Sequence, residues 1–157
     1  METRHAVNEA LQPTTLLLEQ LYHLYMAERQ FALELGELFR DSHSIPRRLT
    51  ISDCRKETSR QILRLERMIQ MTTGASASTA PASMTTLLPL AGDPDEESLA
   101  FDAPLRAVEA SMVAYGAAIS TAQALGEIGV ADLLAESLNE KSDAIVALSK
   151  PAQDLSL

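Results

Sequence analysis

Apolar side chains recur at intervals of three and four residues through the first half of the chain. Between residues 14 and 41 the repeat consists of Leu17, Leu21, Leu24, Tyr25, Ala32, Leu35 and Phe39. Between residues 44 and 71 it consists of Ile51, Cys54, Thr58, Gln61, Leu65 and Met68. Such spacing places side chains on one face of an α-helix. Ser44 can cap the second helix, with Pro46 in its first turn. We therefore predict helices over 14–41 and 44–71.

The second half of the chain repeats this pattern twice, and we predict helices over 101–126 and 129–150. The first repeat consists of Val108, Met112, Tyr115, Ile119 and Ala122. The second consists of Val130, Leu134, Leu138, Lys141, Ile145 and Leu148. Two starts of the third helix remain open: a capping box at Asp93-x-x-Glu96 with Pro94, or Asp102 as the cap before Pro104.

Residues 72–100 separate the two pairs of helices and contain the small, polar stretch TTGASASTAPAS. This composition is typical of a connection rather than of a helix. Short loops make each pair an antiparallel hairpin, and a long crossover between two hairpins is a feature of ferritin-like bundles. We therefore predict one all-α domain over residues 1–157, with a ferritin-like four-helix bundle and a crossover at 72–100.

The composition agrees with a helical bundle and disfavours some classes of binding partner. The chain has 157 residues, of which 46% are hydrophobic and only 4% aromatic, with no Trp. Its formal net charge of −9 disfavours nucleic acid and anionic lipid as partners. The single Cys54 suits a reducing compartment. Because residues 1–13 lack a signal-peptide core and no apolar run reaches 18 residues, we expect a cytoplasmic protein without a membrane span.

Three polar residues interrupt the apolar repeats: Glu28, Gln61 and Lys141. A fourth, Glu57, lies beside the second repeat, one turn before Gln61. One interpretation places these residues at a solvated edge of each helix. The other brings them together at mid-bundle, where carboxylate proteins hold metal ions and where an unpaired buried charge costs several kcal/mol.

Four segments resemble, in order and with matching spacing, the YciF/YciE-type ferritin-like family. Residues 24–38, LYMAERQFALELGEL, are similar to the family's first helix with its LYxAEKQ pattern. Residues 56–68, KETSRQILRLERM, are similar to its EETxxHVxRLE helix. Residues 83–88, SMTTLL, are similar to its AMxGLI segment, and residues 114–141 match AYGTxxAxAxxLG…AAxLLxETLxEEK without a gap.

The resemblance implies a four-helix bundle with a two-metal carboxylate site and a link to bacterial stress responses. By position, Glu28 and Glu57 match two carboxylates of the family's first hairpin. Gln61 stands where the family has His. The first hairpin therefore retains two of the ligands that the resemblance implies.

The second hairpin departs from the family pattern. Ser111 and Lys141 stand where the family has Glu, and Ile145 stands where it has Asp. Glu140 and Asp143, one turn apart, would substitute only if the fourth helix were rotated. Since a two-metal site needs about six ligands, the site is degenerate. We expect Lys141 to form a core ion pair with Glu28 and Glu57 instead.

Our leading interpretation is a non-catalytic bundle that acts by association and needs no metal cofactor. The alternative is an iron or manganese protein that oxidises iron or consumes peroxide, with Glu28, Glu57, Gln61, Glu140 and Asp143 as ligands. We also expect a homodimer formed through the first hairpin, because one bundle cannot bury all the apolar residues outside the main repeat of helix 14–41. These are Leu16, Leu18, Leu33 and Leu38.

Overall fold

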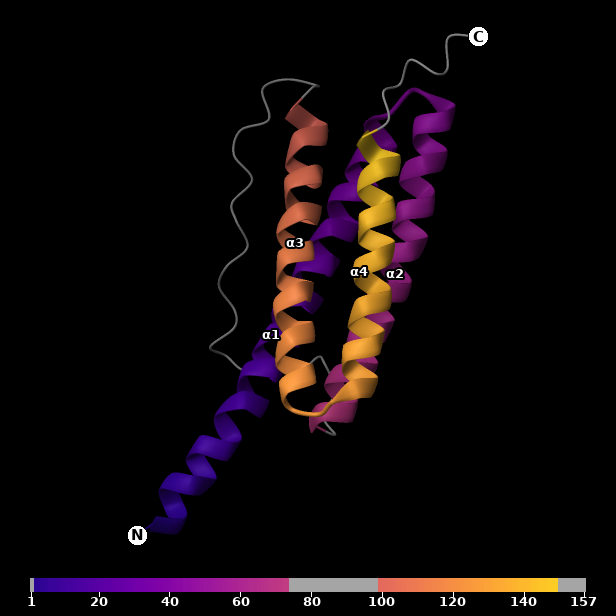
Figure 1. The fold of residues 1–157 in the computed structure, drawn as a ribbon. Coiled ribbons are helices and arrows are strands. Elements are labelled where there is room, and N and C mark those ends of the chain that lie inside the picture. Colours follow the sequence, from indigo (N-terminus) through magenta and orange to yellow (C-terminus); the bar gives the residue numbers. More distant parts are fainter. Residues whose placement is uncertain (1, 74–98, 150–157) are drawn as a thin grey trace.

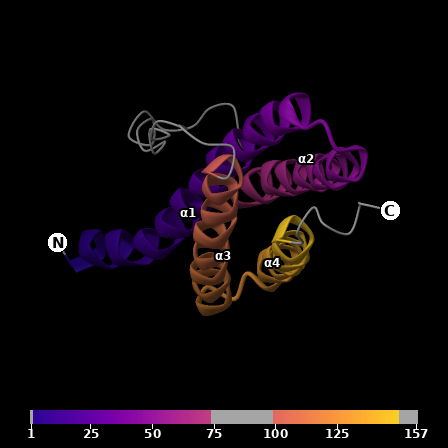
Figure 2. The same cartoon turned by 90° about the horizontal axis from the view of Figure 1, so that it is seen from above.

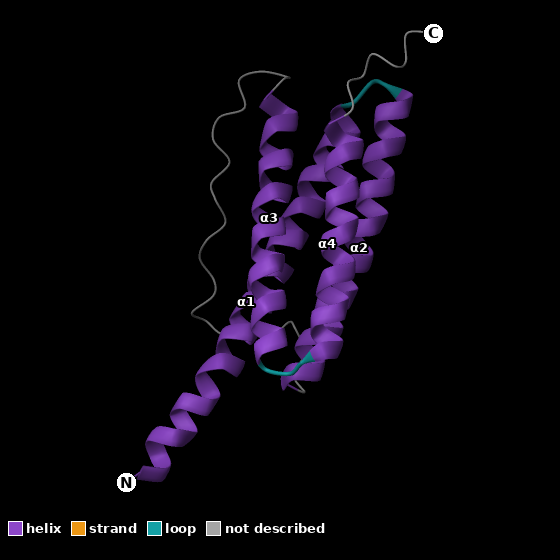
Figure 3. Ribbon diagram, viewed as in Figure 1, coloured by secondary structure: helices purple, strands orange, loops and turns teal. Residues whose placement is uncertain are grey.

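The computed structural model describes residues 2–73 and 99–149, with side chains over 14–72 and 104–149. It contains four helices, namely α1 (Glu2–Asp41), α2 (Ile45–Thr73), α3 (Leu99–Ala124) and α4 (Ile128–Ser149) (Figure 1). Figure 3 shows helices joined by loops, with no strand in the described ranges. The predicted all-α class is therefore confirmed. None of the described helices is long and apolar enough to cross a membrane.

The helix bounds differ from the prediction chiefly at the amino end of α1. This helix begins at Glu2 rather than near residue 14. Residues 2–12 include Glu, Arg, Ala and Leu, which favour helix, and the helix also includes Pro13. In α3, Pro104 lies inside the helix, so Asp102 is not the cap. Most of the predicted crossover, residues 74–98, lies outside the described residues.

Seen from above, α1 and α2 lie together on one side of the molecule, and α3 and α4 lie together on the other (Figure 2). The helices α1 and α2 form one antiparallel hairpin, and α3 and α4 form the other. The two hairpins pack side by side, with α1 against α3 and α2 against α4. This arrangement confirms the predicted ferritin-like bundle of two hairpins.

The turn between α3 and α4 is fixed by Gly126, which adopts a positive φ of 74°. The Glu127 N–H donates to the Ala122 carbonyl at 2.8 Å, and the Gly126 N–H donates to the Gln123 carbonyl at 3.0 Å. This pair of bonds is the Schellman motif, in which glycine takes the left-handed conformation without a Cβ penalty. The motif ends α3 and sets the register of α4 against it.

The core consists of two apolar clusters at opposite ends of the bundle. The first contains Leu17, Leu21, Tyr22, Leu24, Tyr25, Leu65, Met68, Ile69, Tyr115, Ala118, Ala122, Val130, Ala131 and Leu134. The second contains Phe31, Leu35, Ile51, Cys54, Val108, Ala144 and Leu148. On α1, α2 and α4, the predicted polar interruptions Glu28, Gln61 and Lys141 lie between the two clusters, and on α3 Ser111 lies there. The fold therefore encloses polar side chains between two apolar ends.

Candidate functional site: a polar layer at mid-bundle

Six polar residues are buried between the two apolar clusters, and we call them the polar layer. All four helices contribute, with Glu28 from α1, Thr58 and Gln61 from α2, Ser111 from α3, and Ser137 and Lys141 from α4. Each is 9% exposed or less. A buried polar group is costly unless it is hydrogen-bonded or paired, so the contacts within this layer determine what the bundle can hold.

The centre of the layer is an ion pair between Lys141 and Glu28. Lys141 Nζ lies 2.6 Å from Glu28 Oε2, and the two side chains are 2% and 0% exposed. The ammonium also lies 4.4 Å from the centroid of the Phe31 ring, close enough for a cation–π contact. The structure therefore directs Lys141 into the bundle, to the first of its two predicted partners.

Tyr115 joins this pair from α3. Its hydroxyl donates to Glu28 Oε1 at 3.4 Å. Burial raises the pKa of Glu28, and the Lys141 ammonium and the Tyr115 hydroxyl partly oppose that rise. Burial, followed by the negative charge of Glu28, also raises the pKa of Tyr115. The tyrosine therefore remains a proton donor to the carboxylate.

Glu57 is half-buried on α2, beside the layer rather than in it. It makes no ion pair with Lys141. Of the predicted group of Lys141, Glu28 and Glu57, the ion pair contains Lys141 and Glu28. Burial raises the pKa of Glu57, and the neighbouring Glu140 carboxylate raises it further. Glu57 on α2 therefore lies close enough to Glu140, across the seam between α2 and α4, for the two charges to interact.

Gln61 and Glu140 meet across that seam. Gln61 Nε2 donates to Glu140 Oε2 at 3.1 Å, while Gln61 Oε1 is buried without a hydrogen-bond partner. Asp143, by contrast, is exposed on α4. The five predicted ligands therefore separate, with Glu28 paired to Lys141, three residues at the α2–α4 seam and Asp143 at the surface.

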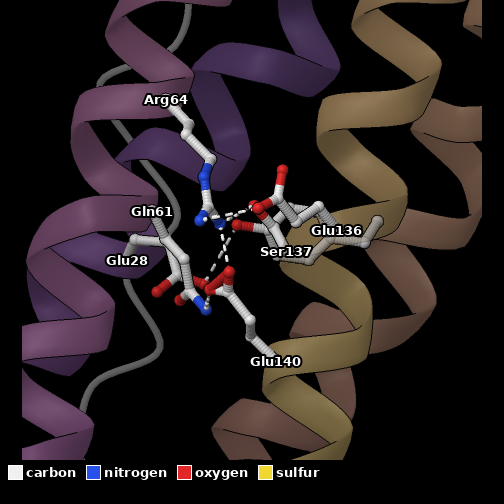
Figure 4. A network of polar contacts seen from close by, with 7 residues as sticks. Glu28, Gln61, Arg64, Glu136, Ser137 and Glu140 are labelled. Carbon is white, nitrogen blue, oxygen red and sulfur yellow. Dashed lines mark hydrogen bonds and ion pairs between the residues drawn. The ribbon is translucent and has the colours of Figure 1, made fainter.

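Sequence reasoning missed Arg64, which lies three residues after Gln61 on α2. Its guanidinium contacts Glu140 Oε1 at 2.6 Å and Glu136 Oε1 at 3.2 Å. It also donates to Ser137 Oγ at 3.3 Å. Figure 4 shows Arg64 reaching from α2 to these three residues of α4. The signal was present, because Glu136 and Glu140 are four residues apart on a facing helix.

Ser137 and Tyr115 lie between the seam and the centre of the layer. Arg64 donates to Ser137, and Tyr115 donates to Glu28. Ser137 is close enough to the Tyr115 hydroxyl to oppose the rise of its pKa. Lys141 meets the same carboxylate from the other side. Two cationic side chains thus lie at opposite ends of a network that includes residues of all four helices.

These residues do not fit a pair of metal ions. Lys141 brings a fixed positive charge to the Glu28 oxygen that a metal would need, and α3 offers Ser111 in place of a carboxylate. In the part of the chain that the structure describes, no three His, Cys, Asp or Glu residues are grouped so that they could hold a metal. The negative charge of Glu28 within the layer is balanced by Lys141, a side chain of the protein itself.

Cys54, the other candidate for chemistry, belongs to the second apolar cluster. It is a free cysteine, 5% exposed. Burial, with a smaller contribution from Glu57, raises the pKa of its thiol to about 11. A thiol with so high a pKa is a poor nucleophile at neutral pH, and Cys54 serves as an apolar core residue.

Comparison with known proteins identifies the family. The profile of a domain of unknown function, DUF892, matches residues 12–156. The chain belongs to the DUF892 family. No curated protein matches the chain. The matched range includes α2, α3, α4 and α1 from residue 12 onward.

Three solved structures share the fold at low sequence identity. A protein from Xanthomonas campestris has a TM-score of 0.72 and 18% identity, over 87% of this chain and 88% of that one. The Escherichia coli stress protein YciF has a TM-score of 0.67 and 20% identity, over 87% and 92%. YcfI, a proposed structural protein from Rhodopseudomonas palustris, has a TM-score of 0.64 and 21% identity, over 87% and 92%. The predicted resemblance to the YciF/YciE-type family is therefore confirmed.

Proposed function

We propose that this DUF892 chain is a non-catalytic, cytoplasmic structural bundle that acts by association and in which an internal ion pair replaces a metal. The supporting observation is the contact of 2.6 Å between Lys141 and Glu28, both buried. An ammonium held there repels a divalent cation and occupies a carboxylate oxygen that the cation would need. The bundle then keeps its core without a cofactor.

The relatives support the same class of role. One structural neighbour is described as a stress protein and another as a proposed structural protein. Those words apply to those proteins. For this chain, a part in a stress response belongs to the proposal and rests on shared family and fold.

Metal content tests the proposal directly. The chain should be purified without chelator and measured by inductively coupled plasma mass spectrometry. We expect iron and manganese far below one ion per chain. Iron or manganese close to one or two ions per chain would contradict the proposal and favour the alternative.

That alternative is an iron or manganese carboxylate protein that oxidises iron or consumes peroxide. One observation favours it, namely the buried, unpartnered Gln61 Oε1 beside the Glu140 carboxylate. Glu57 lies close enough for its charge to couple with that of Glu140. Oxygen acceptors that lack a donor are typical surroundings of a cation. The same metal measurement therefore separates the two functions.

Association through the first hairpin is the second part of the proposal. Leu16 and Leu33 on α1 are 48% and 67% exposed, and Leu63 on α2 is 62% exposed. Burying such side chains between two copies is favourable. We expect a homodimer by light scattering at high micromolar concentration. Leu33→Glu should yield monomers, whereas Val113→Glu, at an equally exposed site on α3, should leave the dimer intact. A wild-type monomer would overturn this part.

A further inference from the structure

Two neighbouring helices of the bundle carry opposite charge. The helix α2 contains seven basic and three acidic residues. The helix α4 contains four acidic residues and one basic residue, Lys141, which is buried. The outer surface of α4 is therefore acidic, whereas that of α2 is mainly basic. Arg64 already joins the two helices, and its contacts with Glu136 and Glu140 show where they face each other.

Exposed charges continue along both helices beyond that contact. On α2, Arg60 and Arg67 are exposed, one turn on either side of Arg64. On α4, Asp132 and Asp143 are exposed, each one turn beyond the two glutamates that Arg64 contacts. Steps of three and four residues keep side chains on one side of a helix. These four charges therefore lie on one side of the molecule, and we call Arg60, Arg67, Asp132 and Asp143 the charged face.

The four charges of this face are not paired with one another. The contacts across the seam show that α2 and α4 run antiparallel. Arg60 therefore lies near the level of Asp143, and Arg67 near the level of Asp132. Nevertheless, among the residues that the structure describes, the ion pairs include none of these four side chains. The charged face is thus available to another molecule.

A face with a basic half and an acidic half is complementary to itself after a two-fold rotation. An axis parallel to the helices places α2 of one copy against α4 of the other, at the same level and in both directions. Arg60 then lies opposite the partner's Asp143, and Arg67 lies opposite the partner's Asp132. An axis across the helices would instead oppose α2 to α2, and opposed like charges are unfavourable. Charge therefore selects one of the two arrangements.

Exposed apolar side chains at one end of the face fit the same arrangement. Met71, one turn after Arg67, is 59% exposed, and Ile128, one turn before Asp132, is 68% exposed. Since both lie at the same end of the bundle, the rotation that pairs the charges also brings Met71 toward the partner's Ile128. Burying two such contacts adds a favourable apolar contribution. Most of the face remains charged, so the contact is a weak one.

The net charge of −9 on each copy opposes this contact only at long range. At physiological ionic strength the Debye length is about 8 Å, so distant charges are largely screened. Charges that touch across the contact are screened much less, and these are opposite in sign. The local pattern of charge therefore outweighs the total charge.

We propose that the charged face is a weak two-fold docking surface for a second copy of this chain, and that it joins the dimers of the proposed function into larger assemblies. The inference rests on that proposed association through the first hairpin, which uses other residues, chiefly Leu16 and Leu33 on α1. The two contacts differ in kind, because the first is apolar and the second depends on salt.

Sedimentation equilibrium of the wild-type chain tests this difference. We expect dimers at high micromolar concentration and larger assemblies as the concentration approaches about 2 mM in about 0.1 M salt. In about 1 M salt, where the Debye length falls to about 3 Å, only dimers should remain. Larger assemblies that persist equally in high salt would contradict a contact made by charge.

A charge exchange assigns the contact to the four residues. Arg60→Glu with Arg67→Glu makes both halves of the face acidic, and Asp132→Lys with Asp143→Lys makes both halves basic. Each double variant alone should remain a dimer up to about 2 mM, because like charges now oppose each other. An equal mixture of the two should form larger assemblies, with an affinity at least about tenfold above that of wild type, since neither variant retains attraction between its own two halves.

A matched control exchanges charges elsewhere. Arg106→Glu with Glu109→Lys, both exposed on α3, should assemble like wild type. Circular dichroism verifies that every variant is folded. A mixture that contains only dimers, or double variants that assemble alone like wild type, would overturn the inference and leave the first-hairpin dimer standing. A wild-type chain that is monomeric under all these conditions would overturn both.

Discussion

The two ion pairs of the polar layer have the same contact distance and opposite surroundings. Lys141–Glu28 and Arg64–Glu140 each bring nitrogen and oxygen to 2.6 Å. The first pair is 2% and 0% exposed, whereas both members of the second are 20% exposed. Water still screens the Arg64 pair, but it does not reach the Lys141 pair. The two ion pairs therefore differ strongly in their free energies of formation, although their contact distances are equal.

The comparison shows that burial, rather than contact distance, determines how each ion pair affects the stability of the fold. Removing two charges from water costs several kcal/mol per ion, which a close contact only partly returns. The raised pKa of Glu28 reflects this cost, since burial outweighs the neighbouring ammonium. The buried pair consequently adds little stability as a pair, yet the loss of one member is expensive. The partly exposed Arg64 pair costs less either to form or to lose.

The largest effect is expected from breaking the buried pair. Lys141→Met leaves Glu28 in the core without a countercharge and should lower the free energy of unfolding by about 3–5 kcal/mol. Arg64→Met, at the partly exposed pair, should lower it by about 0–1 kcal/mol. Urea denaturation of both variants measures the contrast. Equal losses would mean that the two pairs do not differ as their burial indicates.

A double variant tests whether the unpaired charge of Glu28 accounts for the stability lost in Lys141→Met. Lys141→Met with Glu28→Gln removes both charges, so it should recover most of the stability lost in Lys141→Met alone. The exposed Lys56 provides the matched control, because Lys56→Met should change the free energy of unfolding by less than about 0.5 kcal/mol. A double variant no more stable than Lys141→Met would show that packing, and not charge, is at issue.

An intermediate effect is expected from Tyr115, which donates to the carboxylate of the buried pair. Tyr115→Phe removes the hydroxyl that donates to Glu28 and deprives a buried carboxylate of one partner. The loss should be about 1–3 kcal/mol in urea denaturation. The same substitution in a Glu28→Gln background should cost less, since the acceptor is then uncharged. Additive losses in this double-mutant cycle would argue against coupling between the two residues.

The smallest effect is expected from replacing Glu57, and this change should stabilise the protein rather than destabilise it. Its pKa in the folded protein lies above the ordinary value of 4.5. The associated stabilisation is therefore complete below pH 4.5 and is lost as pH rises through the folded pKa. Glu57→Gln should thus raise Tm at pH 7, by the equivalent of less than about 0.5 kcal/mol. Thermal melts should show no gain at pH 4, and a gain there as large as at pH 7 would exclude this explanation.

The sequence predicts the fold and the centre of the site because both depend on periodicity. Apolar repeats locate the helices, and one of the two interpretations of a polar residue within a repeat was that it points inward, as Glu28 and Lys141 do. Periodicity does not show which partner a long side chain selects. It therefore allowed Glu57 as a partner of Lys141, although only Glu28 forms the ion pair.

The seam was harder to predict for a related reason. Arg64 lies beside its repeat, where a long cationic side chain can equally extend into water. Its position depends on how α4 is rotated against α2, which no pattern within one helix specifies. The roles of Ser137 and Tyr115 were not predicted for another reason. A small residue or an aromatic residue within an apolar repeat cannot be distinguished from an ordinary core residue. Their hydroxyl groups matter only once α3 and α4 face α1 and α2.

The polar layer also has a consequence for the order of folding. Each hairpin is closed by a short turn, so its contacts are local and form early. The bond between Tyr115 and Glu28 joins residues 87 positions apart, one in each hairpin. Until the hairpins dock, Glu28 and Lys141 remain hydrated, and docking must strip that water before the pair can close. The layer thus raises the barrier to the last assembly step, and a bundle with an apolar layer would fold faster.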